Sequence, residues 1–183
     1  MPHLWKPFRR ALLAVVVLGL AACETADGPL TPNRDADVPA VTVNGVQLVK
    51  VKPEARGIFL ASNGATAERV SARDGATITN DDAALTIAPG SIPEDTTITM
   101  KAEGDGLLAF AFGPNGLQFD PAATLEISAD KANLDRIDGS DLAIAGASDD
   151  ADDWQVIGGT YDSATNTVTV DIRHFSRYSL CLR

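Results

Sequence analysis

The chain has 183 residues, and 45% of them are hydrophobic although only 5% are aromatic. This length gives room for one domain with short appendages, whose core is expected to consist mostly of Val, Ile, Leu and Ala. The formal net charge of −10 argues against direct binding to nucleic acid or to an anionic lipid surface.

The first 22 residues have the features of a secretory signal peptide. Residues 1–10 are basic, and residues 11–22 form an apolar run that is shorter than the roughly twenty residues of a membrane span. The run ends in LAAC at Cys23, which resembles the lipobox of bacterial lipoproteins. That resemblance implies a diacylglyceryl group on the Cys23 thiol and a further acyl chain on the new N-terminus, which together anchor a protein durably. The alternative is an ordinary signal peptide followed by a chance cysteine.

The residues after Cys23 predict a location and a tether. Removal of residues 1–22 leaves 12 basic and 25 acidic residues, a net charge of −13. Glu24 is not the aspartate that retains enterobacterial lipoproteins in the inner membrane, so the outer membrane is the expected destination. Residues 23–40 are rich in Pro, Asp and Gly without apolar periodicity, which is typical of a flexible tether.

The first part of the domain, expected over residues 41–183, reads as a series of short strands. Residues 41–53 predict a hairpin, because Asn44-Gly45 is a strong signal for a two-residue turn. Residues 57–60 predict a short strand, and residues 65–71 fit either a helical turn or a strand. Residues 76–79 and 83–88 flank an Asn-Asp-Asp turn and predict a second hairpin.

Residues 85–121 contain the clearest alternation in the chain. The first strand ends at Pro89-Gly90, and Ile92 is expected to lie beneath the following turn. Alternation resumes at residues 97–100, at 108–112 and, after the turn signal GPNG, at 123–127.

The C-terminal part continues the pattern with one exception. Residues 129–137 predict a short helical crossover, whereas residues 142–145, 154–158 and 167–172 predict strands, and residues 161–164 predict a turn. Short strands separated by turn signals every eight to twelve residues predict an all-β fold, a β-sandwich.

Three segments resemble the ZU-five domain, which occurs in ankyrins, netrin receptors and bacterial surface lipoproteins. They are LTIAPGSIPEDT at 85–96, FGPNGLQFDPAA at 112–123 and HFSRY at 174–178, and the resemblance extends over residues 74–182. It implies a β-sandwich with a binding or structural role and no shared enzymatic activity. A protein or another component of the cell envelope is the partner that this role implies.

The triplet His174-Phe175-Ser176 resembles the self-cleavage site of certain ZU-five-containing death-domain proteins and of a nucleoporin. The resemblance implies attack of Ser176 Oγ on the Phe175 carbonyl, with His174 as general base, and hydrolysis of the resulting ester. The alternative is structural: His174 bonds to backbone at a strand bend and Ser176 fills a small site. The alternation of Val168, Val170 and Ile172 predicts that even-numbered side chains point into the core. If the same register continues, His174, Ser176, Tyr178 and Leu180 also point inward. A bulge between Arg173 and Ser176 is then needed to bring Phe175 into the core.

Other chemistry finds little support in the sequence. No metal or cofactor site is predicted, because His174 is the single histidine after residue 22 and no phosphate-binding glycine loop or C-x-x-C is present. Residues 148–153 contain four aspartates, but their spacing fits a solvated loop better than a calcium site. Cys181 has no cysteine partner once Cys23 is acylated, and it reads as a small buried residue rather than as part of an intermolecular disulfide. A non-enzymatic protein is therefore expected.

Overall fold

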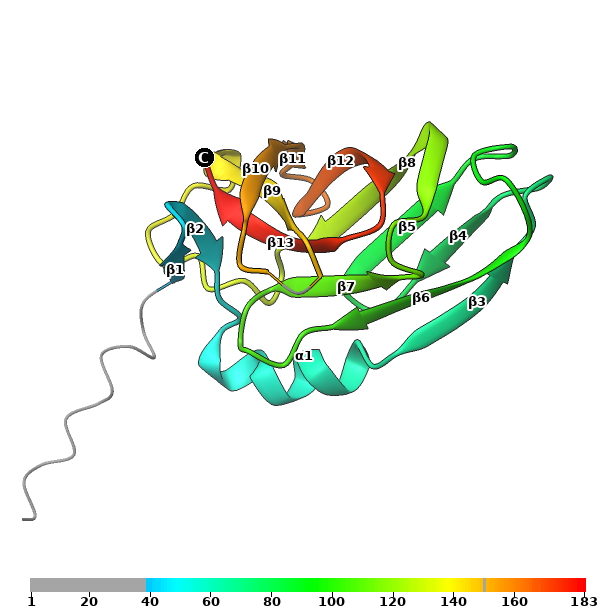
Figure 1. Cartoon of the computed structure of the whole chain (residues 1–183). Helices are drawn as coiled ribbons and strands as arrows, with labels where there is room; N and C mark the ends of the chain where they lie inside the picture. Colours follow the sequence, from blue (N-terminus) through cyan, green and yellow to red (C-terminus); the bar gives the residue numbers. More distant parts are fainter. Residues whose placement is uncertain (1–38, 150) are drawn as a thin grey trace, which may run out of the picture. The chain divides into compact units, whose positions relative to one another are not determined.

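The computed structural model describes residues 39–149 and 151–183, which form two antiparallel sheets around a common core (Figure 1). The predicted all-β sandwich is confirmed. The expected signal peptide, the Cys23 attachment site and tether residues 24–38 lie outside the described residues. Within the described ranges, no helix is long and apolar enough to cross a membrane.

The larger sheet has eight strands. Its order is β1-β2-β13-β7-β6-β3, while β9 pairs with β13 and β10 pairs with β9. The strands are β1 (Ala40–Val43), β2 (Val46–Val49), β3 (Thr66–Val70), β6 (Thr96–Ala102), β7 (Ala109–Gly113), β9 (Leu142–Ala147), β10 (Gln155–Gly158) and β13 (Arg177–Leu182).

The smaller sheet has five strands in the order β11-β12-β8-β5-β4. They are β4 (Ala76–Thr79), β5 (Ala83–Ile87), β8 (Gln118–Ser128), β11 (Thr160–Asp162) and β12 (Thr167–His174). Alternate apolar side chains of this sheet, such as Leu85 and Leu125, are fully buried with Ile98 and Phe110 of the larger sheet in one hydrophobic core. The period-2 pattern of the sequence is therefore the pattern of core contacts.

Three of the predicted turns lie where the sequence places them. Asn44 and Gly45 join β1 to β2 with φ angles of 48° and 83°, as a tight hairpin turn with two left-handed residues requires. Residues 80–82 join β4 to β5, and Ile92 is 4% exposed beneath the turn that follows β5.

The predicted strand at residues 57–60 is wrong. Residues 53–55 form a short 3-10 helix, η2 (Pro53–Ala55), which continues into α1 (Arg56–Ser62). Pro53 at the start favours helical geometry because its φ angle is already fixed there. Phe59 is the buried residue of α1, and its ring lies 5.6 Å from that of Phe110. A four-residue apolar run does not by itself distinguish a strand from a buried helical turn.

Two further predictions require correction, and one ambiguity is resolved. Residues 129–137 form turns instead of a helix, because Ala132 N–H donates to Ala129 and Arg136 has a left-handed φ of 65°. The 3-10 helix η3 (Gly139–Asp141) follows them. The turn expected at residues 161–164 begins later, because Tyr161 and Asp162 pair with β12. The segment at 65–71, which fitted two states, contains strand β3.

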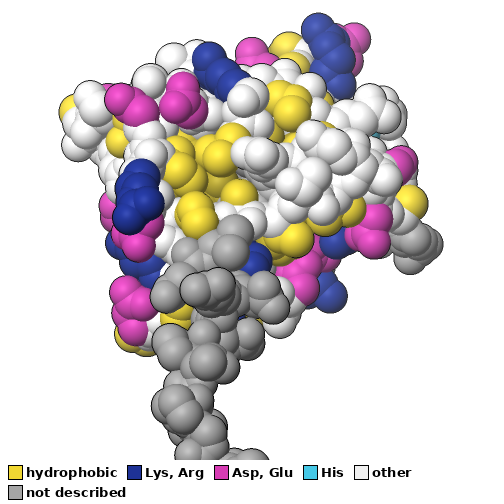
Figure 2. Space-filling model, turned by 90° about the vertical axis from the view of Figure 1, so that its left-hand side faces the viewer, with side chains coloured by type: hydrophobic (Ala, Val, Ile, Leu, Met, Phe, Trp, Pro, Cys, Tyr) yellow, Lys and Arg dark blue, Asp and Glu magenta, His cyan; other side chains and the backbone are white. Residues whose placement is uncertain are grey.

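Figure 2 views the domain from the left-hand side of Figure 1. Hydrophobic side chains gather near the middle of this face, and acidic and basic side chains lie around them. The acidic excess of the chain therefore does not form a patch of one sign on this face. Such a mixed surface gives no strong electrostatic preference for a polyanion or a polycation.

The chain passes from the larger to the smaller sheet between β10 and β11. Gly158 and Gly159 make this crossing with φ angles of 107° and 129°. A Cβ atom at Gly159 would lie 2.9 Å from Cγ1 of Val168 and 3.2 Å from the carbonyl oxygen of Thr169. A Cβ atom at Gly158 would meet nothing within 4 Å. Both positions require left-handed backbone, but only Gly159 is also closely packed.

We predict that Gly159→Ala destabilises the domain more than Gly158→Ala. Both substitutions place a Cβ atom on left-handed backbone, which costs about 1–2 kcal/mol. Gly159→Ala also brings this atom into overlap with Val168 and Thr169. Urea unfolding monitored by tryptophan fluorescence measures the difference. Equal losses of stability in the two variants would contradict the close packing at Gly159.

Candidate functional site

The chain returns from the smaller to the larger sheet at the triplet singled out in the sequence. β12 ends at His174 and β13 begins at Arg177, so Phe175 and Ser176 connect the two sheets. The pairing of β12 with β8 shifts register between Ile172 and His174. The irregularity expected in this region is therefore present, one residue earlier than predicted.

This irregularity reverses the expected orientation of two side chains. Phe175 is 1% exposed, whereas the His174 side chain is exposed. The prediction that His174 points inward is wrong, because the shifted register turns it outward and places Phe175 in the core. The predictions for Ser176, Tyr178 and Leu180 are confirmed, since all three are buried.

Phe175 and Tyr178 fix the crossing. The Phe175 ring lies 4.8 Å from that of Phe119 and 5.7 Å from that of Phe112. The Tyr178 hydroxyl donates a 2.6 Å hydrogen bond to the carbonyl oxygen of His174, and burial raises the pKa of this phenol. The two aromatic residues thus hold both ends of the crossing against the core.

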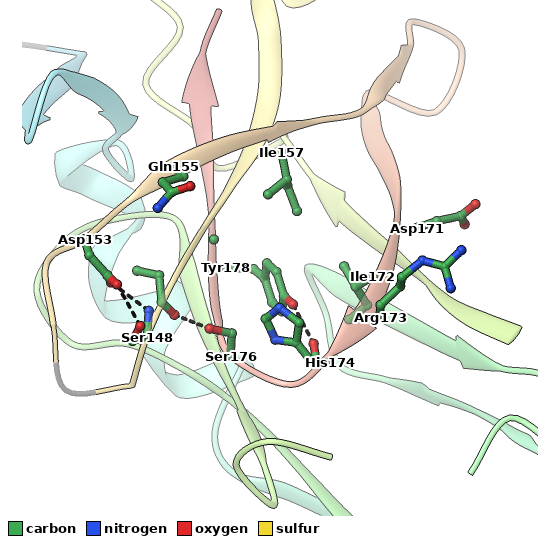
Figure 3. A pocket seen from close by; sticks show the side chains of 12 residues that line it. Ser148, Asp153, Gln155, Ile157, Asp171, Ile172, Arg173, His174, Ser176 and Tyr178 are labelled. Carbon is green, nitrogen blue, oxygen red and sulfur yellow. Dashed lines mark hydrogen bonds between the residues drawn. The ribbon is translucent and has the colours of Figure 1, made fainter. Parts of the chain in front are cut away.

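A pocket of about 390 Å³ lies beside this crossing (Figure 3). We call it the β10–β12 pocket. Its walls come from β9, β10, β12 and the start of β13, and they are lined by Gly146, Ala147, Ser148, Asp153, Gln155, Ile157, Asp171, Ile172, Arg173, His174, Ser176 and Tyr178. The crossing from β12 to β13 therefore borders this hollow.

Asp153 and Ser148 close one end of the β10–β12 pocket. The Asp153 carboxylate accepts hydrogen bonds from the Ser148 hydroxyl at 2.7 Å and from its backbone N–H at 2.8 Å. These two bonds hold the pKa of Asp153 below its usual range, because they favour the ionised carboxylate. The same two bonds hold the Asp153 carboxylate in place and close the loop between Ser148 and Asp153.

His174 and Ser176 are both at the β10–β12 pocket, but each side chain contacts a different partner. The Ser176 hydroxyl donates to the carbonyl oxygen of Ala147. The His174 Nδ1 lies 3.2 Å from the carbonyl oxygen of Phe175. The described residues include no hydrogen bond between the two side chains. With its proton on Nδ1, His174 faces the oxygen of the peptide bond that cleavage would break, and not the serine hydroxyl.

The sequence analysis did not single out Arg177, the next residue along the chain. Its guanidinium forms a two-pronged ion pair with Glu103, with N–O distances of 2.8 and 3.0 Å, and lies 5.0 Å from the centre of the Trp154 ring. The Glu103 contact raises the pKa of Arg177 further. Glu103 and Trp154 are both far from Arg177 in the sequence. Their contacts with Arg177 depend on the pairing of distant strands, so no local sequence signal predicts them.

The arrangement is a mixed polar and apolar hollow without an ordered catalytic pair. Within residues 39–149 and 151–183, no group of three or more His, Cys, Asp or Glu side chains is placed to hold a metal ion. The other residue of interest near the C-terminus, Cys181, is fully buried, and burial raises the pKa of its thiol to about 11. The geometry is suited to contact with a ligand at the rim.

Comparison with known proteins gives no relative: no protein-family model matches this chain, and no curated protein matches it. The resemblance to the ZU-five domain therefore stays a prediction.

We predict that Ser148→Ala raises the pKa of Asp153 toward its usual value. The folded-state pKa of Asp153 is depressed, so its stabilising contribution is present above the unfolded value of about 3.9. That contribution is lost as the pH falls through the folded value. NMR titration of the Asp153 carboxyl carbon measures the shift.

Ser140→Ala is the matched control, because Ser140 lowers the pKa of Asp138 in the same way. It should shift Asp138 and leave Asp153 unchanged. An Asp153 titration curve that is the same with and without the Ser148 hydroxyl would contradict the assigned cause.

Proposed function

We propose that this chain is a bacterial lipoprotein that displays a non-enzymatic β-sandwich at the cell envelope as a binding or structural module. The observation that carries the proposal is the N-terminal sequence: a basic segment, a twelve-residue apolar run and LAAC ending at Cys23. Acyl chains on Cys23 anchor the protein, most readily in the outer membrane, and residues 24–38 separate the anchor from β1. The membrane is thus the first partner, through lipid and not through the acidic surface.

The β10–β12 pocket supports the binding role of the module. It combines apolar walls such as Ile157 and Ile172 with polar groups such as Gln155 and Arg173, as ligand sites generally do. A partner protein or an envelope component is the proposed occupant. Such a binding role requires no reaction.

Self-cleavage between Phe175 and Ser176 is the second candidate. One observation favours it: His174 Nδ1 lies 3.2 Å from the Phe175 carbonyl oxygen, where an N–H would stabilise developing negative charge. Against it, the Ser176 hydroxyl is directed to Ala147 and would have to leave that acceptor before attack. We therefore favour the structural role for the triplet.

We predict that Cys23→Ser abolishes acylation. A serine hydroxyl is not the thiol that accepts the diacylglyceryl group, so the variant should retain residues 1–22 and carry no acyl mass. Intact-mass spectrometry of protein extracted from a Gram-negative membrane measures both features. Cys181→Ala is the control and should be acylated as the wild type is. A wild-type polypeptide without lipid mass would overturn the anchor.

We predict that the wild-type C-terminus is intact through Arg183. The same denaturing mass measurement, made beside Ser176→Ala, tests the second candidate. Loss of residues 176–183 in the wild type alone would identify the triplet as reactive and would replace the passive module by a self-cleaving one.

A further inference from the structure

Three polar side chains meet at a buried point where distant segments of the chain come together. Asn63 follows α1 and is 1% exposed, Asp82 lies in the turn between β4 and β5 and is 4% exposed, and Lys131 follows β8 with a side chain that is 19% exposed. Buried carboxylates and ammonium groups are uncommon because removal from water disfavours both charges. The cluster is distant in sequence from the residues of the β10–β12 pocket, and the proposed function does not use it.

One oxygen atom connects the three side chains. Asp82 Oδ2 accepts a hydrogen bond from Lys131 Nζ at 2.5 Å and also one from Asn63 Nδ2. The amine of Lys131 and the amide nitrogen of Asn63 are therefore neighbours on the same carboxylate oxygen.

The carbonyl group of the Asn63 side chain has its own donor. The backbone N–H of Asp82 donates to Asn63 Oδ1 at 3.0 Å. A fixed N–H at this oxygen withdraws electron density from the amide carbon and stabilises negative charge on the oxygen during attack. Asn63 is thus presented as an electrophile, with a nucleophilic amine and a proton carrier beside it.

We propose that Lys131 and Asn63 form an intramolecular isopeptide bond, assisted by Asp82. The Lys131 ammonium first gives a proton to the Asp82 carboxylate, which removes two opposite charges from a buried site. The neutral amine then attacks Cγ of Asn63, and the negative charge that develops on Oδ1 is held by the Asp82 N–H.

The proton transfers complete the balance. Asp82 returns a proton to Asn63 Nδ2 and takes one from the attacking nitrogen, the Cγ–Nδ2 bond breaks, and ammonia leaves. One N–C bond forms and one breaks, so the step needs no oxidant, reductant or other reactant. Holding the reacting groups on one oxygen makes the reaction effectively unimolecular.

Asn63 is a better electrophile here than Asp82 itself. An amide between Lys131 and Asp82 would form by loss of water, and it would consume the carboxyl group that carries protons from the amine to the leaving group. Loss of ammonia from Asn63 leaves Asp82 free to transfer protons. The two products also differ in mass and in the peptides that they join.

Peptide mapping of the protein purified in its natural full-length or processed form tests the proposal. Trypsin cleaves after Arg and Lys, so the bond should yield peptide 57–69 joined to peptide 102–136, with no cleavage after Lys131 and a mass deficit of one ammonia. Separate, unmodified peptides 57–69 and 102–131 would overturn it. Peptide 74–101 joined to 102–136 with the loss of one water would also overturn it, because Asp82 would then be the acceptor.

Two variants separate the covalent bond from the ion pair. Lys131→Arg keeps a cation beside Asp82 but has no amine nucleophile of comparable reactivity, so the cross-linked peptide should disappear while the domain still folds. Lys52→Arg is the matched control, because Lys52 Nζ donates to the backbone oxygen of Asp130 at 3.0 Å and, among the described residues, contacts no carboxylate. The cross-link should persist in it. A mass deficit that survives Lys131→Arg would overturn the assignment.

Discussion

The burial of Phe175 at the crossing from β12 to β13 is the constraint on which the rest of the sandwich depends. β13 pairs with β9 along its whole length on one side and with β7 and β2 in succession on the other, so it joins three parts of the larger sheet. Its position is set by how the chain arrives from the smaller sheet. Phe175 packs between the Phe112 and Phe119 rings, and the Tyr178 hydroxyl bonds back to His174. Removal of either contact would loosen the arrival point of the strand that holds the larger sheet together.

The β10–β12 pocket is a consequence of that constraint. The chain leaves the larger sheet after β10, at Gly158 and Gly159, and returns to it after β12, at Phe175. The hollow lies between β10, which pairs with β9, and the end of β12. The register shift that buries Phe175 is also what turns His174 to the rim. The residue type that looked catalytic in the sequence is therefore exposed for a structural reason. At the rim, the His174 side chain can contact a ligand. To act as a general base it would have to reach the Ser176 hydroxyl, which instead donates a hydrogen bond to the carbonyl oxygen of Ala147.

The sequence predicts those parts of the fold that depend on local signals. Alternation predicts the strands around Leu85, Leu125 and Val168, and Asn44-Gly45 predicts its hairpin, because side-chain periodicity and turn chemistry act over a few residues. α1 is not predicted, since its one buried residue, Phe59, depends on Phe110 across the sheet. The triplet at 174–176 is recognisable as a site of irregular backbone, but the orientation of His174 depends on its pairing with Gln118 of β8. Contacts such as that of Arg177 with Glu103 require the whole topology and carry no local signature.

Anchoring and the buried cluster are connected by the path of the chain. In a protein held through Cys23, tension enters the sandwich at β1, which is an edge strand and can peel away with few lost contacts. β2 is held next, by two residue pairs with β13, and the chain then passes residues 50 and 51 into α1. Asn63 follows α1, and an isopeptide bond to Lys131 would fasten this point to the segment after β8. Unfolding that starts from the anchor would then stop at Asn63, before β3 and β6 separate, because a covalent bond does not yield at forces that separate hydrogen-bonded strands. A single cross-link at this place would protect β3 to β8, which lie between the two bonded residues, and leave the N-terminal hairpin free to yield.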